Sequence, residues 1–571
     1  MTSVSEGVGA FREGFDGEVV LPSDAGYDEA RSVWNGDIDR RPALIARCRT
    51  ARQVADAIAH ARRQGIELTV RGGGHNFAGS AVADDALMID LSPMSHVIVD
   101  PTARRARCGG GATWADLDGA TQAHGLAVTG GFISHTGVAG LTLGGGMGWL
   151  TGLAGLSCDN LVSADMVLAD GRIVTASADD HPDLFWAIRG GGGNFGVVTE
   201  FEFDLHQVNP LAQLGLLFWG VDQGVEALRL ARDTVAALPE NVGALIAGLS
   251  APPAPFVPQE HHLHPGFALV IASFGSPEEH AELIAPVREA LAPLFELVTP
   301  IPYVQLQKMF DEINEWGRHA YEKALYLDEL SDAAIDVFAS FVPRKASPLS
   351  FVPVFPLRGA YARLGDDDTA FGGSRSTRFA FNIAAICPVP ELLPADREWV
   401  RAFWDAMRPH SSGAGSYVNF MTDLEEDPGQ GGVRRGQIRA PGADQGRVRP
   451  RQRVPPQREH QAGGGVRLIA ALRHDAAMAD DPLDALSSQE LHDLAVRHAR
   501  RHLDVRFFWR LLQALPAAEA AAGELDDAEA DVQNISAHLD DITDSGRGET
   551  ADLLRPLYLE YLREHGVKAP S

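Results

Sequence analysis

Three glycine-rich clusters in the first 200 residues constrain the fold more than any other feature of the sequence. They span residues 71–80, 137–148 and 190–197, and each contains at least three consecutive glycines. Because glycine has no Cβ, such loops leave backbone N–H groups open to a pyrophosphate without a cationic side chain. None has the spacing of a P-loop or of a Gly-x-Gly-x-x-Gly turn, which disfavours nucleoside triphosphates and a simple Rossmann site. Taken singly, each cluster is explained as well by tight turns.

The composition is that of a large globular protein, and its charge narrows the choice of partners. The 571 residues are 45% hydrophobic and 22% charged, which excludes a disordered or fibrous chain. The 77 acidic residues outnumber the 49 Lys and Arg, and the net charge of -28 creates a field that repels nucleic acid and anionic lipid. We therefore expect neither nucleic acid nor a membrane as a partner.

The cysteines and the apolar runs bear on compartment and metal content. Four cysteines lie far apart without a Cys-x-x-Cys pair, so a reducing compartment fits better than a zinc site or a disulfide framework. The histidines within 260–264 lie among prolines and lack the i, i+4 spacing of a catalytic zinc motif, so no metal is expected. No secretory signal is recognised, and no uncharged apolar run reaches the ~18 residues that cross a bilayer. The sequence predicts a soluble, cytoplasmic protein.

Local patterns predict helices and strands in mixed order through the first half of the chain. Helical periodicity over 50–64 is followed by a short strand over 66–70 that enters the first glycine cluster. The segment 166–175 has the pattern of a β-hairpin with Gly171 in its turn, and 197–205 alternates like a half-buried strand. These patterns are typical of an α+β fold. Further along, helices are predicted at 224–238 and 277–291, and strands at 267–274 and 377–385.

These patterns divide the chain into four parts. We predict a first α+β domain over 1–205 and a second α+β domain over 206–425. The segment 426–477 is rich in Arg, Pro, Gly and Gln and has no aromatic residue up to position 465, so it cannot form a packed core. The last part, 478–571, is acidic and helix-patterned, which predicts an all-α module of unknown function.

Several motifs in a fixed order are far more specific than any one glycine cluster. Together they resemble, from about residue 21 to residue 423, the berberine-bridge-enzyme-like branch of the vanillyl-alcohol-oxidase-type flavoproteins. The resemblance implies a PCMH-type FAD-binding domain followed by a substrate domain. The motifs are Tyr27-Asp28-x-x-Arg31-x-x-Trp34-Asn35, the cluster at 71–80, Gly111-Ala112-Thr113-Trp114, the run from Thr136 to Gly146, Cys158-Asp159-Asn160-Leu161, the run from Arg189 to Val198, and Tyr417-Val418-Asn419-Phe420.

The resemblance further implies that FAD lies across the first domain, with its pyrophosphate on the loop 71–75. His75 stands where such enzymes carry the histidine bonded to the flavin, a substituent that makes the flavin a stronger oxidant. Relatives with a second link carry a cysteine where this chain has Ile133, so a single bond is expected, and Cys158 is interpreted as a buried, inert thiol. The implied cofactor-binding residues are Arg71, Gly72, Gly73, Gly74, His75, Asn76, Ser80, Gly111, Gly130, Thr136, Gly137, Gly140, Gly144, Gly145, Asp159, Asn160, Gly193, Gly196, Val197 and Asn419.

Tyr417 stands at the Tyr-x-Asn position that supplies the base in relatives. A phenol with a pKa of ~10 must be held near the flavin and a positive neighbour to lose its proton at pH 7. The implied reaction moves a hydride from an alcohol or amine carbon of a sugar or secondary metabolite to flavin N5, and dioxygen then reoxidises the flavin. Tyr321 and Lys323 resemble a pocket element that polarises substrate or Tyr417, although a core tyrosine and a surface lysine explain the pair nearly as well. A dehydrogenase with another electron acceptor would share all these motifs.

Beyond Phe420 the chain departs from the family. Relatives continue into a helix and a tail that return to the flavin domain. Residues 436–461 do not resemble this tail, but codons that encode them can be chosen so that reading one nucleotide later gives such a tail. We hypothesise a frameshift near 425–434 that fused a neighbouring reading frame starting at Met478. A second interpretation is an inactive flavin-domain remnant joined to a helical interaction module. Losing the tail would remove buried contacts from the flavin domain, and their contribution is comparable with a typical net stability of ~5 to 15 kcal/mol.

Overall fold

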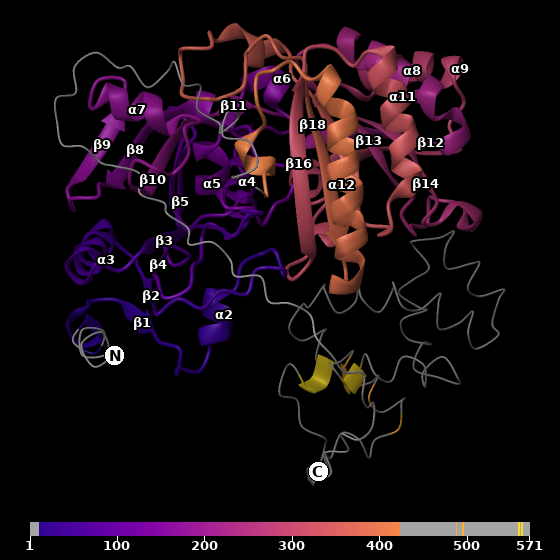
Figure 1. The fold of residues 1–571 in the computed structure, drawn as a ribbon. Helices are drawn as coiled ribbons and strands as arrows, with labels where there is room; N and C mark the ends of the chain where they lie inside the picture. The colour runs from indigo at the N-terminus through magenta and orange to yellow at the C-terminus, as the bar shows by residue number, and fades with distance from the viewer. Residues whose placement is uncertain are drawn as a thin grey trace. The chain divides into compact units, whose positions relative to one another are not determined.

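The computed structural model describes Gly9, residues 11–422 and a few positions between 487 and 563 (Figure 1). The chain divides into two units, Met1–Gln445 and Gly446–Ser571, and the fold described here is that of the first. The predicted helical module and the hypothesised frameshift lie almost wholly outside the described residues. Among these residues, no helix is long and apolar enough to cross a bilayer, and no group of three His, Cys, Asp or Glu side chains could hold a metal ion.

The first domain begins with a small sheet of four strands. Helix α3 (Ala51–Gln64) confirms the predicted helix and connects two of these strands. The hydroxyl of Thr50 caps its first turn by accepting from the amide of Gln53, and Gly65 ends it with a φ of 65°. The order of the strands is β1 (Glu18–Val20), β2 (Leu44–Arg47), β4 (Leu87–Asp90) and β3 (Leu68–Arg71), of which the last three are parallel; α2 (Tyr27–Arg31) follows β1.

A second, antiparallel sheet completes the first domain. The predicted hairpin is confirmed: its turn places Gly171 at a φ of 87°, and the alternating strand buries Phe201 and Phe203. The strand order is β5 (Val97–Asp100), β6 (Arg105–Gly109), β10 (Val197–Asp204), β8 (Leu161–Val167) and β9 (Ile173–Ser177). The shorter elements of this domain are α4 (Trp114–Gln122), β7 (Leu126–Ala127), α5 (Val138–Leu143), α6 (Thr151–Ala154) and α7 (Pro182–Ile188), and β7 pairs with β11 (His206–Gln207).

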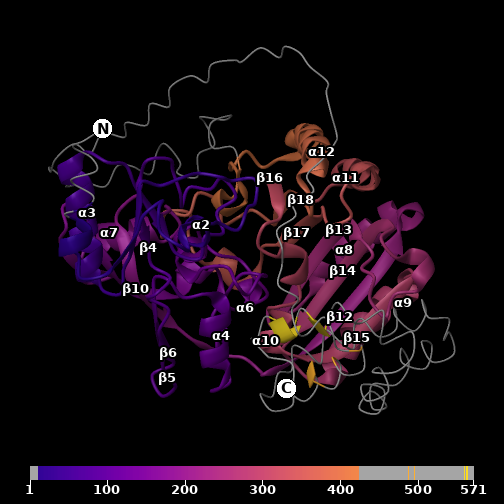
Figure 2. The same cartoon turned by 90° about the horizontal axis from the view of Figure 1, so that it is seen from below.

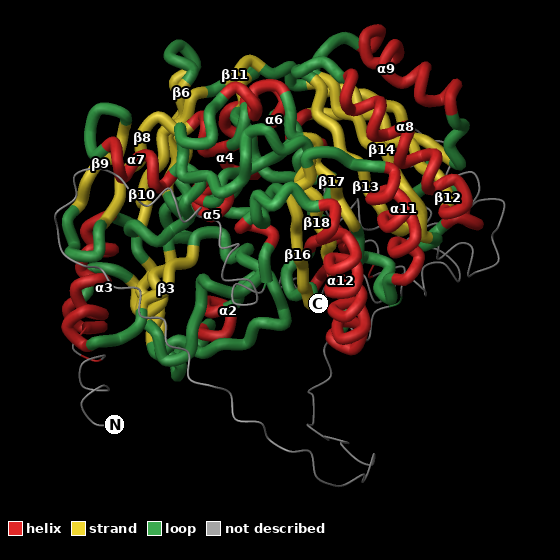
Figure 3. Tube along the Cα trace, turned by 45° about the horizontal axis from the view of Figure 1, so that its top comes forward, coloured by secondary structure: helices red, strands yellow, loops and turns green. Residues whose placement is uncertain are grey.

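The second α+β region is built on one antiparallel sheet of seven strands. All four of its predicted elements are present within two residues of the predicted bounds. The strand order is β15 (Phe295–Pro302), β12 (Leu211–Gly220), β14 (Pro265–Ser273), β13 (Val242–Ser250), β17 (Val352–Pro356), β18 (Phe379–Cys387) and β16 (His319–Leu327). Helices α8 (Gly224–Ala237), α9 (Pro277–Ala290), α11 (Asp332–Phe341) and α12 (Leu393–Met407) cover one face (Figure 3), and α10 (Tyr303–Leu306) follows β15.

The two faces of the seven-stranded sheet have different neighbours, because successive side chains of a strand point to opposite faces. On β16, Tyr321 and Leu325 belong to the core beneath the helices. On the opposite face, Ala320 packs with Trp34 of the first domain and Tyr326 belongs to a cluster that includes first-domain residues. We call this second face the site face. The sheet therefore lies between the first domain and its own helices (Figure 2).

Candidate active site

His75 lies in a box of rings just beyond strand β3. Its imidazole stacks on Trp34, with centroids 5.4 Å apart, and meets the edge of Trp316 at 5.9 Å. The Nε2 atom of His75 lies 2.7 Å from Nδ1 of His135. Burial, and to a lesser degree His135, hold the pKa of His75 well below its usual value. The imidazole is therefore neutral at pH 7, the form in which a ring nitrogen is nucleophilic.

The loop before His75 presents backbone donors with no partner. Within residues 11–422, the amides of Gly72, Gly73, Gly74 and His75 donate to no acceptor. Gly74 has a φ of 69°, and a Cβ on Gly73 would lie 2.2 Å from the amide nitrogen of Gly137, so only glycine lets these two loops meet. Arg71 also keeps a buried Nε that has no hydrogen-bond partner in the part of the chain that the structure describes. A run of unpaired N–H groups beside a guanidinium suits an anionic ligand such as a pyrophosphate.

Tyr417 is buried against the second glycine cluster. Its hydroxyl oxygen accepts from the amide of Gly146 at 2.8 Å and from Nδ2 of Asn419 at 2.9 Å. A Cβ on Gly144 would lie 2.2 Å from the Asn419 amide, so this position requires glycine. Burial raises the pKa of Tyr417, and the two N–H donors oppose that effect only in part. Tyr417 therefore keeps its proton at pH 7 in these surroundings.

The structure does not bring Tyr321 and Lys323 to Tyr417, which corrects the predicted polarising pair. The hydroxyl of Tyr321 accepts from Nε of Arg401 at 3.0 Å, and Nζ of Lys323 lies 4.7 Å from the ring centroid of Trp404. Arg401 and Trp404 belong to α12. Both predicted side chains thus point to the helix-covered face, whereas Tyr417 packs on the site face.

Glu322 is the residue of this strand that faces the site, and the sequence analysis missed it. Its side chain is 1% exposed; Oε2 accepts from Nδ2 of Asn382 at 2.9 Å, while Oε1 has no hydrogen-bond partner among the described residues. Glu322 follows Ala320 and precedes Tyr326 on the site face, so it lies between the Trp34 and Tyr417 clusters. Burial raises its pKa well above the usual value. The available signal was the one acidic residue of a mostly apolar strand.

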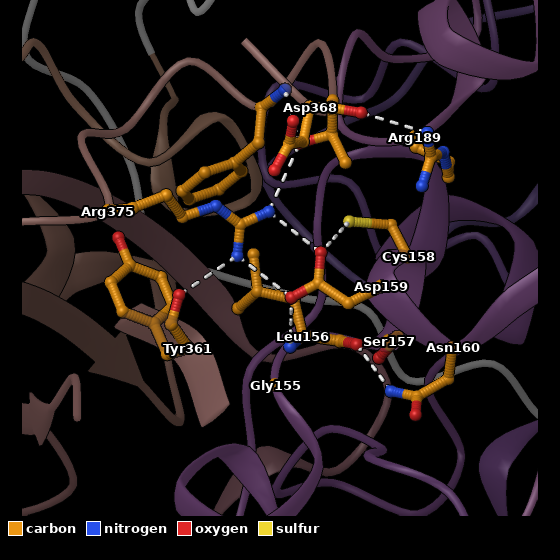
Figure 4. A network of polar contacts seen from close by, with 12 residues as sticks. Gly155, Leu156, Ser157, Cys158, Asp159, Asn160, Arg189, Tyr361, Asp368 and Arg375 are labelled. Atoms are coloured by element: carbon orange, nitrogen blue, oxygen red, sulfur yellow. Dashed lines mark hydrogen bonds and ion pairs between the residues drawn. The ribbon is translucent and has the colours of Figure 1, made fainter. Parts of the chain in front are cut away.

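Asp159 and Asn160 have their polar atoms engaged inside the protein (Figure 4). The Asp159 carboxylate accepts from both terminal nitrogens of Arg375, at 2.8 and 2.7 Å, and from the amide of Leu156. Asn160 donates to the carbonyls of Ala154 and Leu156 and accepts from His206. These contacts give both residues a structural role and do not support the predicted direct contact with FAD.

The remaining predicted cofactor residues lie in tight loops, in the core or at the surface. Glycines 111, 130 and 145 stand where a Cβ would lie within 3.0 Å of another residue, and the carbonyl of Thr136 accepts from the amide of Trp114. Val197 is a core residue paired with Val167, and Gly196 precedes it with a φ of 151°. Asn76, Ser80, Gly140 and Gly193 are exposed. Cys158 is buried, and burial raises its pKa, as expected of an inert thiol.

Comparison with known proteins places this site in a family. Residues 42–177 match the FAD binding domain family. The (R)-6-hydroxynicotine oxidase of Paenarthrobacter nicotinovorans is 38% identical over 203 residues, which is 36% of this chain and only 44% of that protein. The FAD-linked oxidoreductase pgmH of Aspergillus terreus (strain NIH 2624) is 30% identical over 354 residues, 59% of this chain and 68% of that protein. The chain belongs to the FAD-linked oxidoreductases.

A solved relative has the same fold as this FAD-linked oxidoreductase. The glucooligosaccharide oxidase of Acremonium strictum, described with a 6-S-cysteinyl, 8α-N1-histidyl FAD, superposes with a TM-score of 0.63. It is 23% identical, and the match covers 72% of this chain and 90% of that one. The residues of this FAD-linked oxidoreductase fit the cofactor, because the unpaired amides of 72–75 provide a cradle for a pyrophosphate and end at a neutral imidazole.

A buried carboxyl joins the two domains of the FAD-linked oxidoreductase. Asp118 of α4 accepts at Oδ2 from Nε2 of Gln307 at 2.9 Å, while its Oδ1 has no partner among the described residues. The hydroxyl of Tyr303 is buried nearby and has no hydrogen-bond partner within the described ranges; burial, and to a lesser degree Asp118, raise its pKa. Burial raises the pKa of Asp118 to about 7, although the hydrogen bond from Gln307 lowers it in part.

We expect the substitution Asp118→Asn to remove a pH-dependent part of the stability. The folded pKa of about 7 exceeds the unfolded value. Protonated Asp118 therefore stabilises the fold fully below about pH 4, and this contribution is lost as the pH rises to 7. Each pH unit inside this window changes the free energy of unfolding by about 1.4 kcal/mol. Urea unfolding at pH 5 and pH 7 should show the wild type losing stability relative to the variant; a constant difference would contradict the assignment.

Proposed function

We propose that the chain is an FAD-dependent oxidase that takes a hydride from a carbon bearing a hydroxyl or amino group and passes the electrons to dioxygen. The observation that carries the proposal is the placement of Glu322 on the site face between the box around His75 and Tyr417. The amides of 72–75, with Arg71 beside them, would hold the pyrophosphate of FAD. When bound, FAD supplies the hydride acceptor.

Covalent attachment of FAD through His75 alone is the second element of the proposal. His75 is neutral, and its Nε2 atom is engaged by His135, so Nδ1 is the ring nitrogen without a hydrogen bond among the described residues. The solved glucooligosaccharide oxidase carries a histidyl and a cysteinyl link. This chain has Ile133 at the position that the family resemblance assigns to the cysteine, which supports a single link.

Glu322 and Tyr417 divide the handling of the substrate proton. The buried Glu322 side chain has an oxygen without a hydrogen-bond partner among the described residues, and burial raises its pKa, which makes its carboxylate a stronger base. We assign it the role of proton acceptor, in place of the Tyr417 base expected from the sequence. The oxygen of Tyr417 already accepts two N–H bonds, so its own O–H is free to donate to a substrate oxygen or nitrogen. Tyr417 thereby orients the substrate.

The lining near Tyr417 favours a flat, apolar secondary metabolite over an oligosaccharide. Phe132, Trp149 and Phe355 line a small pocket there. Phe355 stacks on Phe420 at 5.5 Å, and Phe420 meets the Tyr417 ring edge-on at 4.8 Å. Arg358, the charged residue of the lining, donates to the backbone carbonyls of residues 238, 239 and 242. An oligosaccharide would leave many hydroxyl groups here without partners.

Acid denaturation of the purified 571-residue protein tests the attachment. We expect yellow colour and gel fluorescence to remain with the denatured wild-type polypeptide and to be lost entirely in His75→Ala. The matched control is His124→Ala, an exposed histidine outside the site, which should stay yellow. Colourless wild-type protein would contradict the proposal and favour the inactive remnant.

Oxygen consumption tests the reaction. The wild type should consume dioxygen with planar heterocyclic alcohols or amines and much less with oligosaccharides. Stopped-flow reoxidation of the reduced enzyme by dioxygen then separates an oxidase from a dehydrogenase, because only an oxidase is reoxidised rapidly by dioxygen. Preference for oligosaccharides would overturn the proposed substrate class.

A further inference from the structure

His135 is held directly against the side of His75 that faces away from Nδ1. The two rings are 4.7 Å apart and tilted by 40°, and Nδ1 of His135 lies 2.7 Å from Nε2 of His75. The loop that carries His135 is anchored to the second domain, because the Asp311 carboxylate accepts from the amide of Ser134 at 2.8 Å and from its hydroxyl at 2.6 Å. The position of the loop that carries His135 thus depends on the second domain as well as the first.

The covalent link proposed above fixes which ring nitrogens carry the protons. Attack on the flavin needs a lone pair on Nδ1 of His75, and a neutral imidazole then has its one N–H group at Nε2. This group faces Nδ1 of His135 at 2.7 Å, so Nδ1 of His135 accepts the hydrogen bond with its lone pair, and the proton of neutral His135 lies on Nε2.

We propose that His135 is a positioning residue for attachment of the flavin: it holds His75 in the tautomer with a nucleophilic Nδ1 and accepts the Nε2 proton as Nδ1 reacts. This inference rests on the covalent link proposed above. Nδ1 of His75 forms a bond to the 8α carbon, one C–H bond of that carbon breaks, and the N–H bond at Nε2 breaks as its proton passes to His135. The two electrons of the C–H bond reduce the flavin. Dioxygen, the oxidant, takes them with two protons as hydrogen peroxide.

The Asp311 carboxylate supports the transient cation on His135. A proton on Nδ1 of His135 would make the ring an imidazolium, and the negative charge of Asp311 favours that form. The charge therefore develops beside a fixed carboxylate, which is held by two hydrogen bonds from Ser134 and does not have to move. This arrangement lets His135 act as a temporary proton acceptor although burial disfavours its charged form.

The test follows the rate of attachment in the full-length chain produced without flavin. FAD is added in air, and samples over time are divided between gel filtration, which reports total bound FAD, and a denaturing gel, whose fluorescence reports covalent FAD. His135→Leu removes both the acceptor and the base, whereas His135→Asn keeps an acceptor oxygen near the place of Nδ1 but cannot take up the proton. We expect a rate constant about 100-fold lower for His135→Leu and an intermediate value for His135→Asn, with total FAD unchanged. The control His124→Leu should match the wild type.

Each result separates this inference from the function on which it rests. Wild-type rates in both His135 variants, with FAD bound, would overturn the role of His135 and leave covalent attachment intact. Bound but never covalent FAD in the wild type would overturn the attachment and this inference with it. If His135→Leu binds no FAD, the comparison of the wild type with His135→Asn decides: an equal rate overturns the inference, and a slower one at equal FAD content supports it.

Discussion

Replacing Glu322 with glutamine is expected to slow reduction of the flavin by about 100- to 10 000-fold, the usual contribution of a general base. Glutamine keeps the shape of the side chain and the contact with Asn382 but cannot accept the substrate proton. The Oε1 atom of Glu322, which has no partner among the described residues, is the atom assigned to that step. The measurement is the rate of anaerobic bleaching of the flavin band in a stopped-flow instrument.

Matched variants on the other face of the same strand test the direction of these side chains. Tyr321→Phe and Lys323→Met alter residues that contact Arg401 and Trp404 of α12, so flavin reduction should stay within about threefold of the wild type. If flavin reduction is slowed in Tyr417→Phe but keeps its wild-type rate in Glu322→Gln, the proton acceptor is the phenol of Tyr417. Slow reduction in Tyr321→Phe would contradict the assignment of faces.

Removing Arg375 is expected to lower the free energy of unfolding by about 3 to 5 kcal/mol, as when one partner of a buried ion pair is removed. Arg375 and Asp159 are 4% and 7% exposed, and their bonds link a loop of the second domain to the turn η1 (Ser157–Asn160). The guanidinium also lies 5.2 Å from the ring centroids of both Tyr361 and Phe371. In Arg375→Met, Asp159 would remain as a buried carboxylate without its counter-ion. Urea unfolding of the wild type and the variant measures the loss.

The double variant Arg375→Met/Asp159→Asn separates two contributions to the loss of stability: the unpaired charge of Asp159 and the lost packing of Arg375. Because it removes the unpaired carboxylate, it should be more stable than the single variant. Arg172→Met is the control: Arg172 and Asp170 form an exposed pair, worth about 0 to 1 kcal/mol. A loss in Arg375→Met no larger than in Arg172→Met would show that the buried pair contributes little.

The fold was predictable where the structure depends on neighbours in sequence. Thr50 caps α3 within its own first turn, and Gly171 makes the turn between two strands that it directly connects. The direction of the side chains on β16 was not predictable from the sequence, because both faces of that strand are buried. Tyr321 is 1% exposed on one face and Tyr326 is 0% exposed on the other, so alternation of apolar and polar residues carries no information about which face meets the site.

The candidate site was predictable only as a set of positions. Motif order singled out His75 and Tyr417, yet the partners that set their chemistry come from distant segments. His135 lies 60 residues from His75, and Arg375 lies 216 residues from Asp159, whose predicted contact with FAD ignored that partner. Nothing local in the Cys-Asp-Asn-Leu motif indicates that its carboxylate is already bound by a guanidinium from the other domain.

The site combines glycine loops, where substitutions are not tolerated, with a sheet face, where they are. A side chain at Gly73 or Gly111 would collide with backbone atoms of a neighbouring loop, so these places admit no alternative residue. Next to Glu322, the site face instead presents side chains of β16, β17 and β18, whose backbones are fixed by the sheet ladder. Randomising that face alone would create a library of catalysts that share one cofactor cradle and differ in the molecules they oxidise.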